Sequence, residues 1–250
     1  MIYLSCLLAA IGLADIVRAR SPRPALLIIA SALGVALTVG LHWLVGVNVV
    51  VLVVSGGVLV AWVVGTSHSS FGIRKIAVGM LGAVTLAGIA LSGSTIAAAP
   101  TGPNPAQSWF ASLTYPALET VSFGQALAVA SLAVFLIESA NVIVRTVLEL
   151  PDDEDAPRTT RGKLGARRPA PAPLKGGRVI GPLERIFLFA LALAGQFTAI
   201  GAIVAAKGIV RFPEISRDNN RGSNAELFLV GSFTSWALVL VAVLLARLSA

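Results

Sequence analysis

The stretch GRVIGPLERIFLFALALAGQFTAIGAIVAAKGIVRF, residues 177–212, decides how the rest of the chain is interpreted. It begins with charged residues, continues as a long apolar run and ends with Lys207 and Arg211. A second apolar run follows, opened by the acidic Glu226. A helix needs about 20 apolar residues to cross roughly 30 Å of hydrocarbon. We therefore expect a helical hairpin over 177–250 that crosses a membrane twice, with spans at 183–206 and 227–246.

The composition of the whole chain indicates the same class of protein. Its 250 residues have a mean hydropathy of +0.86 and are 56% hydrophobic and 12% charged. Soluble domains carry roughly 25% charged residues, so this chain has far fewer than a soluble fold needs. Membrane barrels are excluded because their strands alternate in polarity every second residue. The composition predicts an all-α, polytopic integral membrane bundle.

The other apolar runs predict five further spans in residues 1–148, for about seven in total. They are placed at 2–17, 25–45, 47–65, 76–98 and 121–144, with a short surface helix over 106–113. Because two of these runs are short, a count of six stays open. The polar, Pro-rich stretch 149–176 has almost nothing to bury and predicts a disordered cytoplasmic linker. The chain thus divides into a five-span region (1–148), this linker and a two-span hairpin (177–250).

The distribution of positive charge predicts an orientation. Cytoplasmic loops of membrane proteins are enriched in Lys and Arg. With the N-terminus outside, 15 of the 19 Lys and Arg residues lie inside, and the remaining four lie in the loop of the final hairpin (Lys207, Arg211, Arg217 and Arg221). Seven spans then place the C-terminus inside, in a cytoplasmic (inner) membrane. The net charge of +7 follows from this enrichment, so we expect membrane lipids as partners and no nucleic acid.

Cysteine and histidine are too scarce for a metal centre or a disulfide framework. The chain has one cysteine, Cys6, and two histidines, His42 and His68. A dedicated zinc site needs about four such ligands. No motif for a nucleotide or a metal is present, so we expect no cofactor.

Several charged residues fall inside the predicted spans. Asp15 lies three residues before Arg18, which predicts an ion pair within one helix. Glu138 shares a helix face with Asn141 and Arg145. A carboxylate at membrane depth is a functional candidate, although Glu138 is close enough to the helix end to reach Arg145 or water.

Small residues repeat along one face of the span 76–98. Gly79, Ala83 and Ala87 are four residues apart, a spacing that lets helix backbones approach closely. We interpret this face as packing inside the bundle, and we interpret Gly195 in the same way within the span 183–206.

The hairpin carries two groups of charges, one at each mouth. At the outer mouth, Lys207 and Arg211 lie one turn apart, with Glu226 at the same height. Arg binds phosphate through a bidentate fork, so these three residues predict an anion or lipid-phosphate site, unless the carboxylates of Glu226 and Glu214 only neutralise the two cations.

The inner-mouth polar cluster comprises Arg178, Glu184, Arg185 and Glu138. Arg185 and Lys207 are 22 residues apart in the sequence. In one continuous helix this separation is about 33 Å, so we expect the two clusters to be separate.

The motifs GRVIGPLER, GQFTAIG and AAKGIVRF, followed by Glu226, resemble the C-terminal part of a family of uncharacterised bacterial polytopic membrane proteins. The resemblance covers residues 177–246. It implies a multi-pass bacterial membrane protein and supplies no reaction, substrate or partner. The family usually has tyrosine after its acidic residue, where this chain has Leu227.

Two main hypotheses of function follow, and whether the chain is an enzyme stays open. The first is a non-enzymatic accessory, assembly or transport-related component, which acts with a protein partner or as a homo-oligomer. The second is a membrane enzyme or carrier acting on a lipid-linked phosphate, with Lys207 and Arg211 holding the anion and Glu226 as a base. An ion-coupled transporter using Glu138 is a third, less supported hypothesis.

Overall fold

A computed structural model describes residues 1–19, 24–45, 49–92, 104–149, 177–216 and 223–250, and within these ranges the chain is helical. Most of the predicted linker, 150–176, lies outside the described residues, and so do Arg217 and Arg221. The helices are α1 (Ile2–Arg18), α2 (Pro24–Val45), α3 (Val49–Thr66), α4 (Phe71–Ala90), α5 (Pro105–Ala111), η2 (Pro116–Leu118), α6 (Phe123–Ile137), α7 (Ser139–Val147), α8 (Gly177–Leu193), α9 (Phe197–Ser216) and α10 (Ser223–Leu248).

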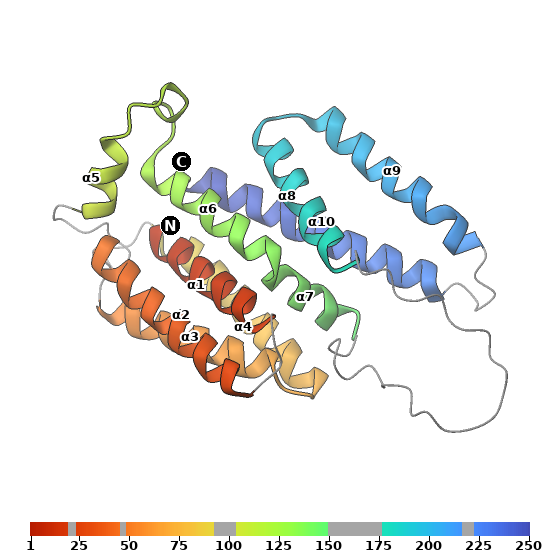
Figure 1. Cartoon of the computed structure of the whole chain (residues 1–250), viewed down its shortest axis with the longest axis horizontal. Helices are drawn as coiled ribbons and strands as arrows, with labels where there is room; N and C mark the ends of the chain where they lie inside the picture. Colours follow the sequence, from red (N-terminus) through yellow and green to blue (C-terminus); the bar gives the residue numbers. More distant parts are fainter. Residues whose placement is uncertain (20–23, 46–48, 93–103, 150–176, 217–222) are drawn as a thin grey trace.

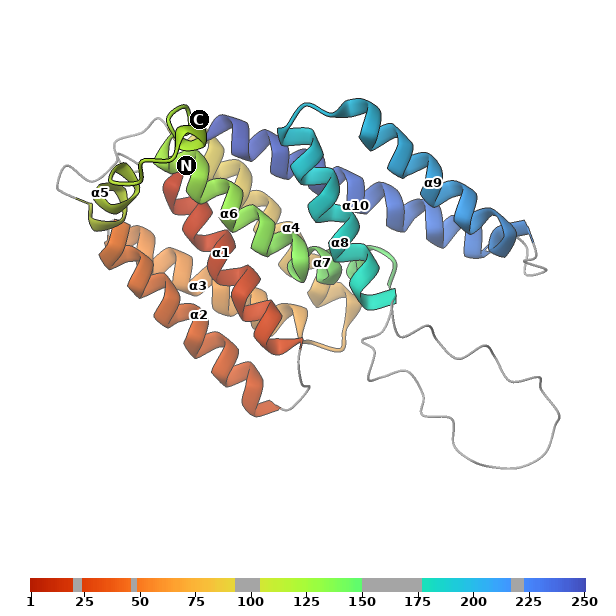
Figure 2. The same ribbon diagram turned by 45° about the horizontal axis from the view of Figure 1, so that its top comes forward.

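The helices form a bundle around α1 and α6 (Figures 1 and 2). The helices α2, α3 and α4 lie on one side of this central pair, and α8 and α10 lie on the other. The helix α9 lies outermost, beyond α8. The short α5 lies at the end of the bundle where α6 begins. Its bounds overlap those of the predicted surface helix, 106–113.

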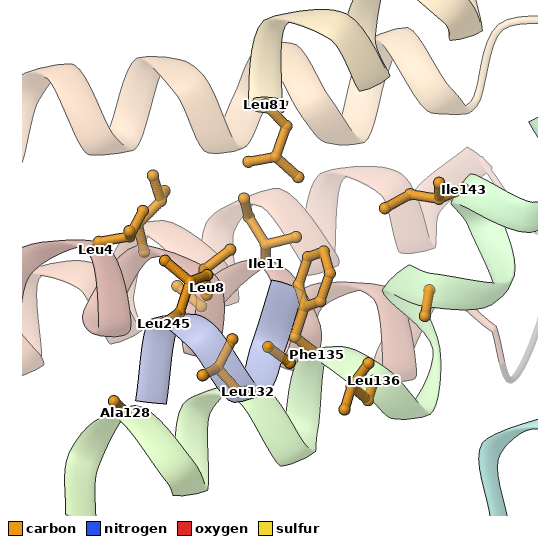
Figure 3. Close-up of a cluster of buried hydrophobic side chains, with 14 of the residues drawn as sticks. Leu4, Leu8, Ile11, Leu81, Ala128, Leu132, Phe135, Leu136, Ile143 and Leu245 are labelled. Carbon is orange, nitrogen blue, oxygen red and sulfur yellow. The ribbon is translucent and has the colours of Figure 1, made fainter. Parts of the chain in front are cut away.

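One hydrophobic core joins the early and late helices of the chain. It contains the buried residues Leu8 and Ile11 from α1, Leu132 from α6 and Leu245 from α10 (Figure 3). Leu188 from α8 belongs to the same buried core. The predicted five-span region and the C-terminal helices therefore pack together through shared apolar side chains.

Glycine allows the two central helices to approach closely. A Cβ atom on Gly12 of α1 would lie 2.9 Å from Cγ1 of Val134 and 3.0 Å from the backbone nitrogen of Phe135 in α6, so α6 would have to shift to accept a larger residue. The backbones therefore pack closely, as in membrane helix pairs built on small residues.

Three of the described helices are long and apolar enough to cross a membrane: α3, α4 and the segment 225–248 of α10. The pair α6 and α7 makes a fourth if it is counted as one span. Their outward faces carry large apolar side chains, such as Val53 (68% exposed) and Ile76 (72% exposed). Contiguous apolar faces of this kind are unfavourable in water. These helices support a membrane location, but they do not confirm seven spans.

The outward face of α4 includes the small-residue stripe that we expected inside the bundle. Gly79, Ala83 and Ala87 are exposed, and a Cβ atom on Gly79 would meet no other atom within 4 Å. The prediction of internal packing was therefore wrong. The face of α4 that packs inward carries Arg74, Ala77 and Leu81 instead.

The predicted span 183–206 is interrupted by a reversal of the chain. Gly195 has a φ of +71°, which favours glycine, and it ends α8. The amide of Gln196 donates to the carbonyl of Leu191 (2.8 Å), and the amide of Gly195 donates to that of Ala192 (3.2 Å). These two bonds form a Schellman motif, which closes a helix with glycine in the left-handed conformation. Thus α8 and α9 form a hairpin, and Gly195 turns the chain rather than packing a continuous helix.

The predicted span 121–144 is also divided. The helices α6 and α7 meet at Glu138 and are bent by 49°. The amide of Asn141 donates to the carbonyl of Glu138 (2.9 Å) instead of that of Ile137, so the carbonyl of Ile137 needs other donors. One of them is the side-chain amide of Asn141 (3.2 Å).

Both termini lie at the same end of the bundle (Figure 1). The hydroxyl of Ser122 donates to the carbonyl of Ser249 (3.3 Å), and a Cβ atom on Gly124 would contact both Ser249 and Ile2. An odd number of complete crossings would separate the termini. Three or four of the described helices qualify as spans, so the predicted outside N-terminus and inside C-terminus stay a prediction.

Candidate functional site

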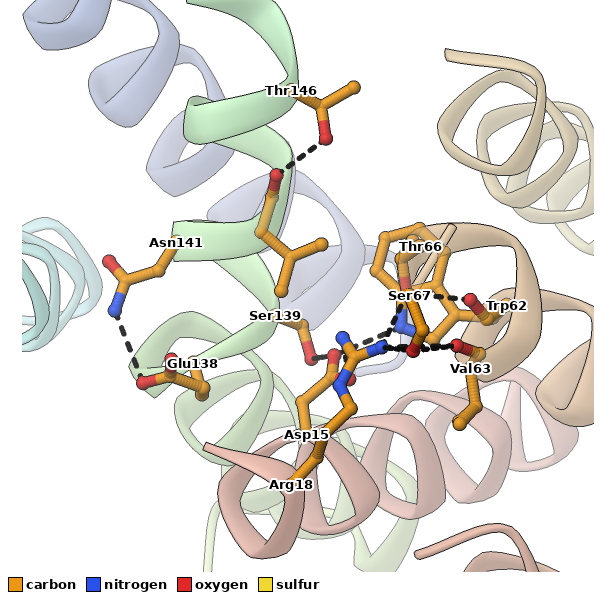
Figure 4. A network of polar contacts seen from close by, with 11 residues as sticks. Asp15, Arg18, Trp62, Val63, Thr66, Ser67, Glu138, Ser139, Asn141 and Thr146 are labelled. Carbon is orange, nitrogen blue, oxygen red and sulfur yellow. Dashed lines mark hydrogen bonds and ion pairs between the residues drawn. The ribbon is translucent and has the colours of Figure 1, made fainter. Parts of the chain in front are cut away.

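Asp15 is the centre of the first of three polar clusters in the bundle interior. Its side chain is fully buried and pairs with Arg18 at 2.8 Å, as the sequence predicted. The other carboxylate oxygen accepts bonds from Trp62 of α3 (2.9 Å) and Ser139 of α7 (2.6 Å). Figure 4 shows these donors converging on Asp15 from three helices.

Arg18 extends this cluster to the end of α3. Its guanidinium donates to the carbonyl of Val63 (3.1 Å) and to the hydroxyls of Thr66 (2.8 Å) and Ser67 (2.6 Å). The last carbonyls of a helix have no partner within the helix, so a cationic donor there stabilises its end. The Asp15–Arg18 pair therefore fixes α1 against α3.

Arg185 is the centre of the second cluster, at the bend between α6 and α7. Its Nε donates to the carbonyl of Leu136 (2.9 Å), and one terminal nitrogen donates to the carbonyl of Ile137 (3.4 Å). The guanidinium also donates to Asn141 and lies 3.5 Å from the hydroxyl of Ser235 in α10. Arg185 is only 2% exposed, so it supplies the donors that the bend requires.

Glu138 lies at the bend itself and accepts a bond from Asn141 (3.2 Å). This contact confirms that the two side chains share a face, as expected from their spacing. Its neighbour Ser139 belongs to the Asp15 cluster, so the first two clusters meet at consecutive residues.

Glu184 and Lys207 form the third cluster, and this contact corrects the sequence analysis. The Nζ atom of Lys207 lies 2.8 Å from one carboxylate oxygen of Glu184 and 2.7 Å from the other. The two residues were assigned to opposite mouths because a continuous helix was assumed. The reversal at Gly195 brings them to the same height on adjacent antiparallel helices.

Aromatic rings from α10 complete the third cluster. The indole nitrogen of Trp236 donates to Glu184 (3.1 Å). The Nζ atom of Lys207 lies 5.7 Å from the ring centroid of Trp236 and 5.9 Å from that of Phe228. Such distances place the ammonium within range of a cation–π interaction with both rings.

The three clusters lie side by side across the bundle. We call them together the polar layer. Glu138 and Ser139 link the first cluster to the second, and Glu184 and Arg185 link the second to the third. Each interior charge of the layer is bound by donors or acceptors of neighbouring helices.

Arg211 and Glu226 are both exposed, and the predicted triad with Lys207 stays a prediction. Arg178 lies in the first turn of α8 and Glu214 near the end of α9, and neither side chain is among those that the structure describes.

Sequence reasoning missed the neutral partners of the layer: Trp62, Ser139, Ser235 and Trp236. They lie in apolar runs, where an isolated serine or tryptophan is a common residue. The sequence offered one signal for them, the number of charged residues inside apolar runs. Each such charge needs a hydrogen-bonding partner when it is buried, and the sequence analysis had not found these partners.

The part of the chain that the structure describes contains no group of three or more His, Cys, Asp or Glu side chains arranged to hold a metal ion. Cys6 is buried, and the Nδ1 of His68 accepts a bond from the amide of Ser70 (3.1 Å).

Comparison with known proteins adds no further information on the site. No protein-family model, curated protein or solved structure matches the chain. The resemblance of residues 177–246 to a bacterial membrane family therefore stays a prediction.

Proposed function

We propose that this chain is a non-enzymatic integral membrane protein with a transport-related role. The observation that carries the proposal is the polar layer, which crosses the interior where α6 and α7 are broken at Glu138. In secondary transporters, broken helices present free carbonyls and charged groups near the bilayer midplane. Here the carbonyls of Leu136 and Ile137 face the guanidinium of Arg185.

A structural role alone explains the layer less well. A charge inside a membrane is costly, and helices can be joined by apolar packing without one. The chain nevertheless buries Asp15 and Arg185 and partly buries Glu184 and Lys207, together with the partners that each needs. This arrangement is expected where a site must hold and release charge.

The distribution of basic residues supports an orientation with both termini outside. Arg247 lies in the last turn of α10, at the end of the bundle that contains the termini. Arg18, Arg74 and Arg145 lie at the helix ends opposite to it, whereas Arg185 and Lys207 lie near the middle of α8 and α9. The positive-inside rule then assigns that opposite end to the cytoplasm. We place the protein in the bacterial cytoplasmic membrane in this orientation.

Reconstitution in proteoliposomes tests the transport-related role. Charge movement is recorded after concentration jumps of protons, Na⁺, K⁺ and small organic cations. We expect a current with at least one of these ions, reduced in Glu138→Gln. The matched control Glu119→Gln removes an exposed carboxylate far from the layer and should leave the current unchanged.

Two other outcomes would contradict this role. Monodisperse protein that gives no current with any ion, and that co-purifies with a stoichiometric protein partner, would identify an accessory or assembly component. Turnover of a lipid-linked phosphate by the isolated chain would identify the enzyme of the alternative hypothesis.

The lipid-phosphate alternative has less support from the geometry. It requires Lys207 and Arg211 to bind one anion, but the ammonium of Lys207 is held by both oxygens of Glu184. A phosphate would have to displace that carboxylate. The alternative predicts that Lys207→Ala and Glu226→Gln each abolish lipid binding.

A further inference from the structure

The third cluster has the composition of a receptor for an ammonium group. Glu184 offers two carboxylate oxygens, and Trp236 and Phe228 offer two aromatic rings. We call these three residues the cation cage. Trp236 is held in place by its bond to Glu184 (3.1 Å) and by an edge-to-face contact with Phe233, with ring centroids 5.5 Å apart. A carboxylate combined with aromatic rings is the arrangement that recognises ammonium ligands.

The cage and its occupant come from different helices. Glu184 belongs to α8, and both rings belong to α10, two helices that pack against α6 and contribute Leu188 and Leu245 to the core. Lys207 comes from α9, which contributes no fully buried side chain to that core. The cage walls are thus built without α9, and Lys207 enters them as a ligand would.

Among the described side chains of α9, only those in its first half pack against the hydrophobic core. Ile200 and Ile203 pack against the core in the first half of the helix. Beyond Lys207, Ile209 (73% exposed) and Val210 (72% exposed) contact little of the protein. In Figures 1 and 2 this half of α9 extends away from α6 and α7. Displacing it would expose the cage and break few apolar contacts.

We propose that the cation cage binds a small ammonium cation, a primary or quaternary amine, and that Lys207 is a tethered competitor that occupies it at rest. The inference rests on the proposed transport-related role and gives its substrate class. The amine replaces the ammonium of Lys207 at the same two oxygens and two rings. The ligand is either a free amine or the amino headgroup of a lipid, since both present the same group.

Competition by a tethered group has a measurable consequence. A side chain on a short tether acts as a ligand at an effective concentration in the mM range. External amines therefore bind weakly to the native protein. Removing the charge of Lys207 while keeping its volume should free the cage.

Binding is measured on the full chain in nanodiscs of phosphatidylglycerol, through the fluorescence of Trp236. Ethylammonium and tetramethylammonium are titrated into the native protein and into Lys207→Met. We expect Lys207→Met to bind at least one of them about tenfold more tightly or better, because the tethered competitor is gone. Glu184→Gln on the Lys207→Met background should abolish binding, and Trp236→Phe should abolish the signal.

Three controls keep the result interpretable. Arg211→Met removes a cation one turn along α9, outside the cage, and should leave the affinity at the native value. If Lys207→Met does not stay monodisperse, Lys207→Gln replaces it, because an amide still bonds to Glu184. Nanodiscs that contain phosphatidylethanolamine distinguish the sources: a change in Trp236 fluorescence without soluble amine assigns the site to the lipid headgroup.

A folded Lys207 variant whose Trp236 fluorescence responds to neither amine nor to phosphatidylethanolamine would overturn the proposal. This outcome is independent of the current measurements, since no transport is involved. Amine binding without any current would support the cage and contradict the transport-related role. A current carried only by inorganic ions, without amine binding, would support the transport-related role and contradict the cation cage.

Discussion

Asp15 is bound by donors from its own helix, from α3 and from α7. Its charge balances Arg18, which in turn holds the end of α3. Loss of one partner of a buried ion pair leaves the other charge uncompensated, and this costs about 3–5 kcal/mol. The Asp15 cluster is thus a principal contact between the first helix and the rest of the bundle.

We predict that Asp15→Asn strongly lowers the thermal stability of the detergent-solubilised protein. The amide can still accept from Trp62 and Ser139, but it cannot neutralise Arg18. Melting is followed by size-exclusion chromatography after heating. Glu119→Gln makes the same chemical change at an exposed carboxylate and should shift the melting temperature little. Equal melting temperatures for Asp15→Asn and the native protein would show that the buried pair is not structural.

The bend between α6 and α7 depends on a residue of another helix. Arg185 donates to the carbonyls of Leu136 and Ile137, which lie immediately before the bend. Unpaired carbonyls in the interior are unfavourable, so either these donors remain or the helix must straighten. The guanidinium therefore holds the two halves at their observed angle of 49°.

We predict that Arg185→Met loosens this bend. Spin labels at Ala130→Cys in α6 and Val147→Cys in α7, on a Cys6→Ala background, report the angle between the helices through their distance. Both positions are exposed, so the labels should not disturb packing. The distance distribution should broaden in Arg185→Met and stay unchanged in Arg247→Met, which alters an exposed arginine of α10. Identical distributions for Arg185→Met and the native protein would contradict this role of Arg185.

The sequence predicts individual helices better than the connections between them. The run 186–206 is apolar apart from Gln196 and Thr198, and hydropathy does not show where a chain reverses, so Gly195 was interpreted as a packing residue. The sequence did contain the relevant signal, since glycine after a helical segment is the common residue of a Schellman motif. The bend at Glu138 gave no such signal, because its partner Arg185 is distant in the sequence.

The candidate site was predicted in part for the same reason. The Asp15–Arg18 pair and the shared face of Glu138 and Asn141 follow from helical periodicity, and the structure confirms both. The contact of Glu184 with Lys207 depends on the reversal at Gly195, and a sequence read as one helix assigned them to opposite ends. Periodicity predicts contacts within a helix, whereas contacts between helices require the topology.

At the scale of the whole molecule, the position of the termini distinguishes the observed topology from the one first expected. The chain reverses between α8 and α9, which returns α10 to the end where α1 begins (Figure 2). An even number of complete crossings would then place both termini on the same side of a membrane. The sequence-based topology with seven complete spans places them on opposite sides.

We predict that the two ends and the connection before α6 are accessible from outside the cell. On a Cys6→Ala background, an impermeant maleimide should label Ala250→Cys and Tyr115→Cys in intact cells. Ser69→Cys, between α3 and α4, should be labelled only after permeabilisation. Labelling of Ala250→Cys together with Ser69→Cys would place the C-terminus inside and contradict the observed topology.

The most informative experiment is a cysteine cross-link between Glu184→Cys and Lys207→Cys on the Cys6→Ala background, formed in native membranes with a short bifunctional methanethiosulfonate linker and identified by mass spectrometry of the linked peptides. The linker spans the gap left by the two long side chains, whose ends are in contact in the native protein. We predict efficient cross-linking for this pair and none for Glu184→Cys with Phe197→Cys, because Phe197 lies ten residues, or about 15 Å, along α9 from Lys207. If α8 and α9 were one continuous helix, positions 184 and 207 would be about 34 Å apart. Absence of the cross-link in folded protein would therefore contradict the hairpin and the site built on it.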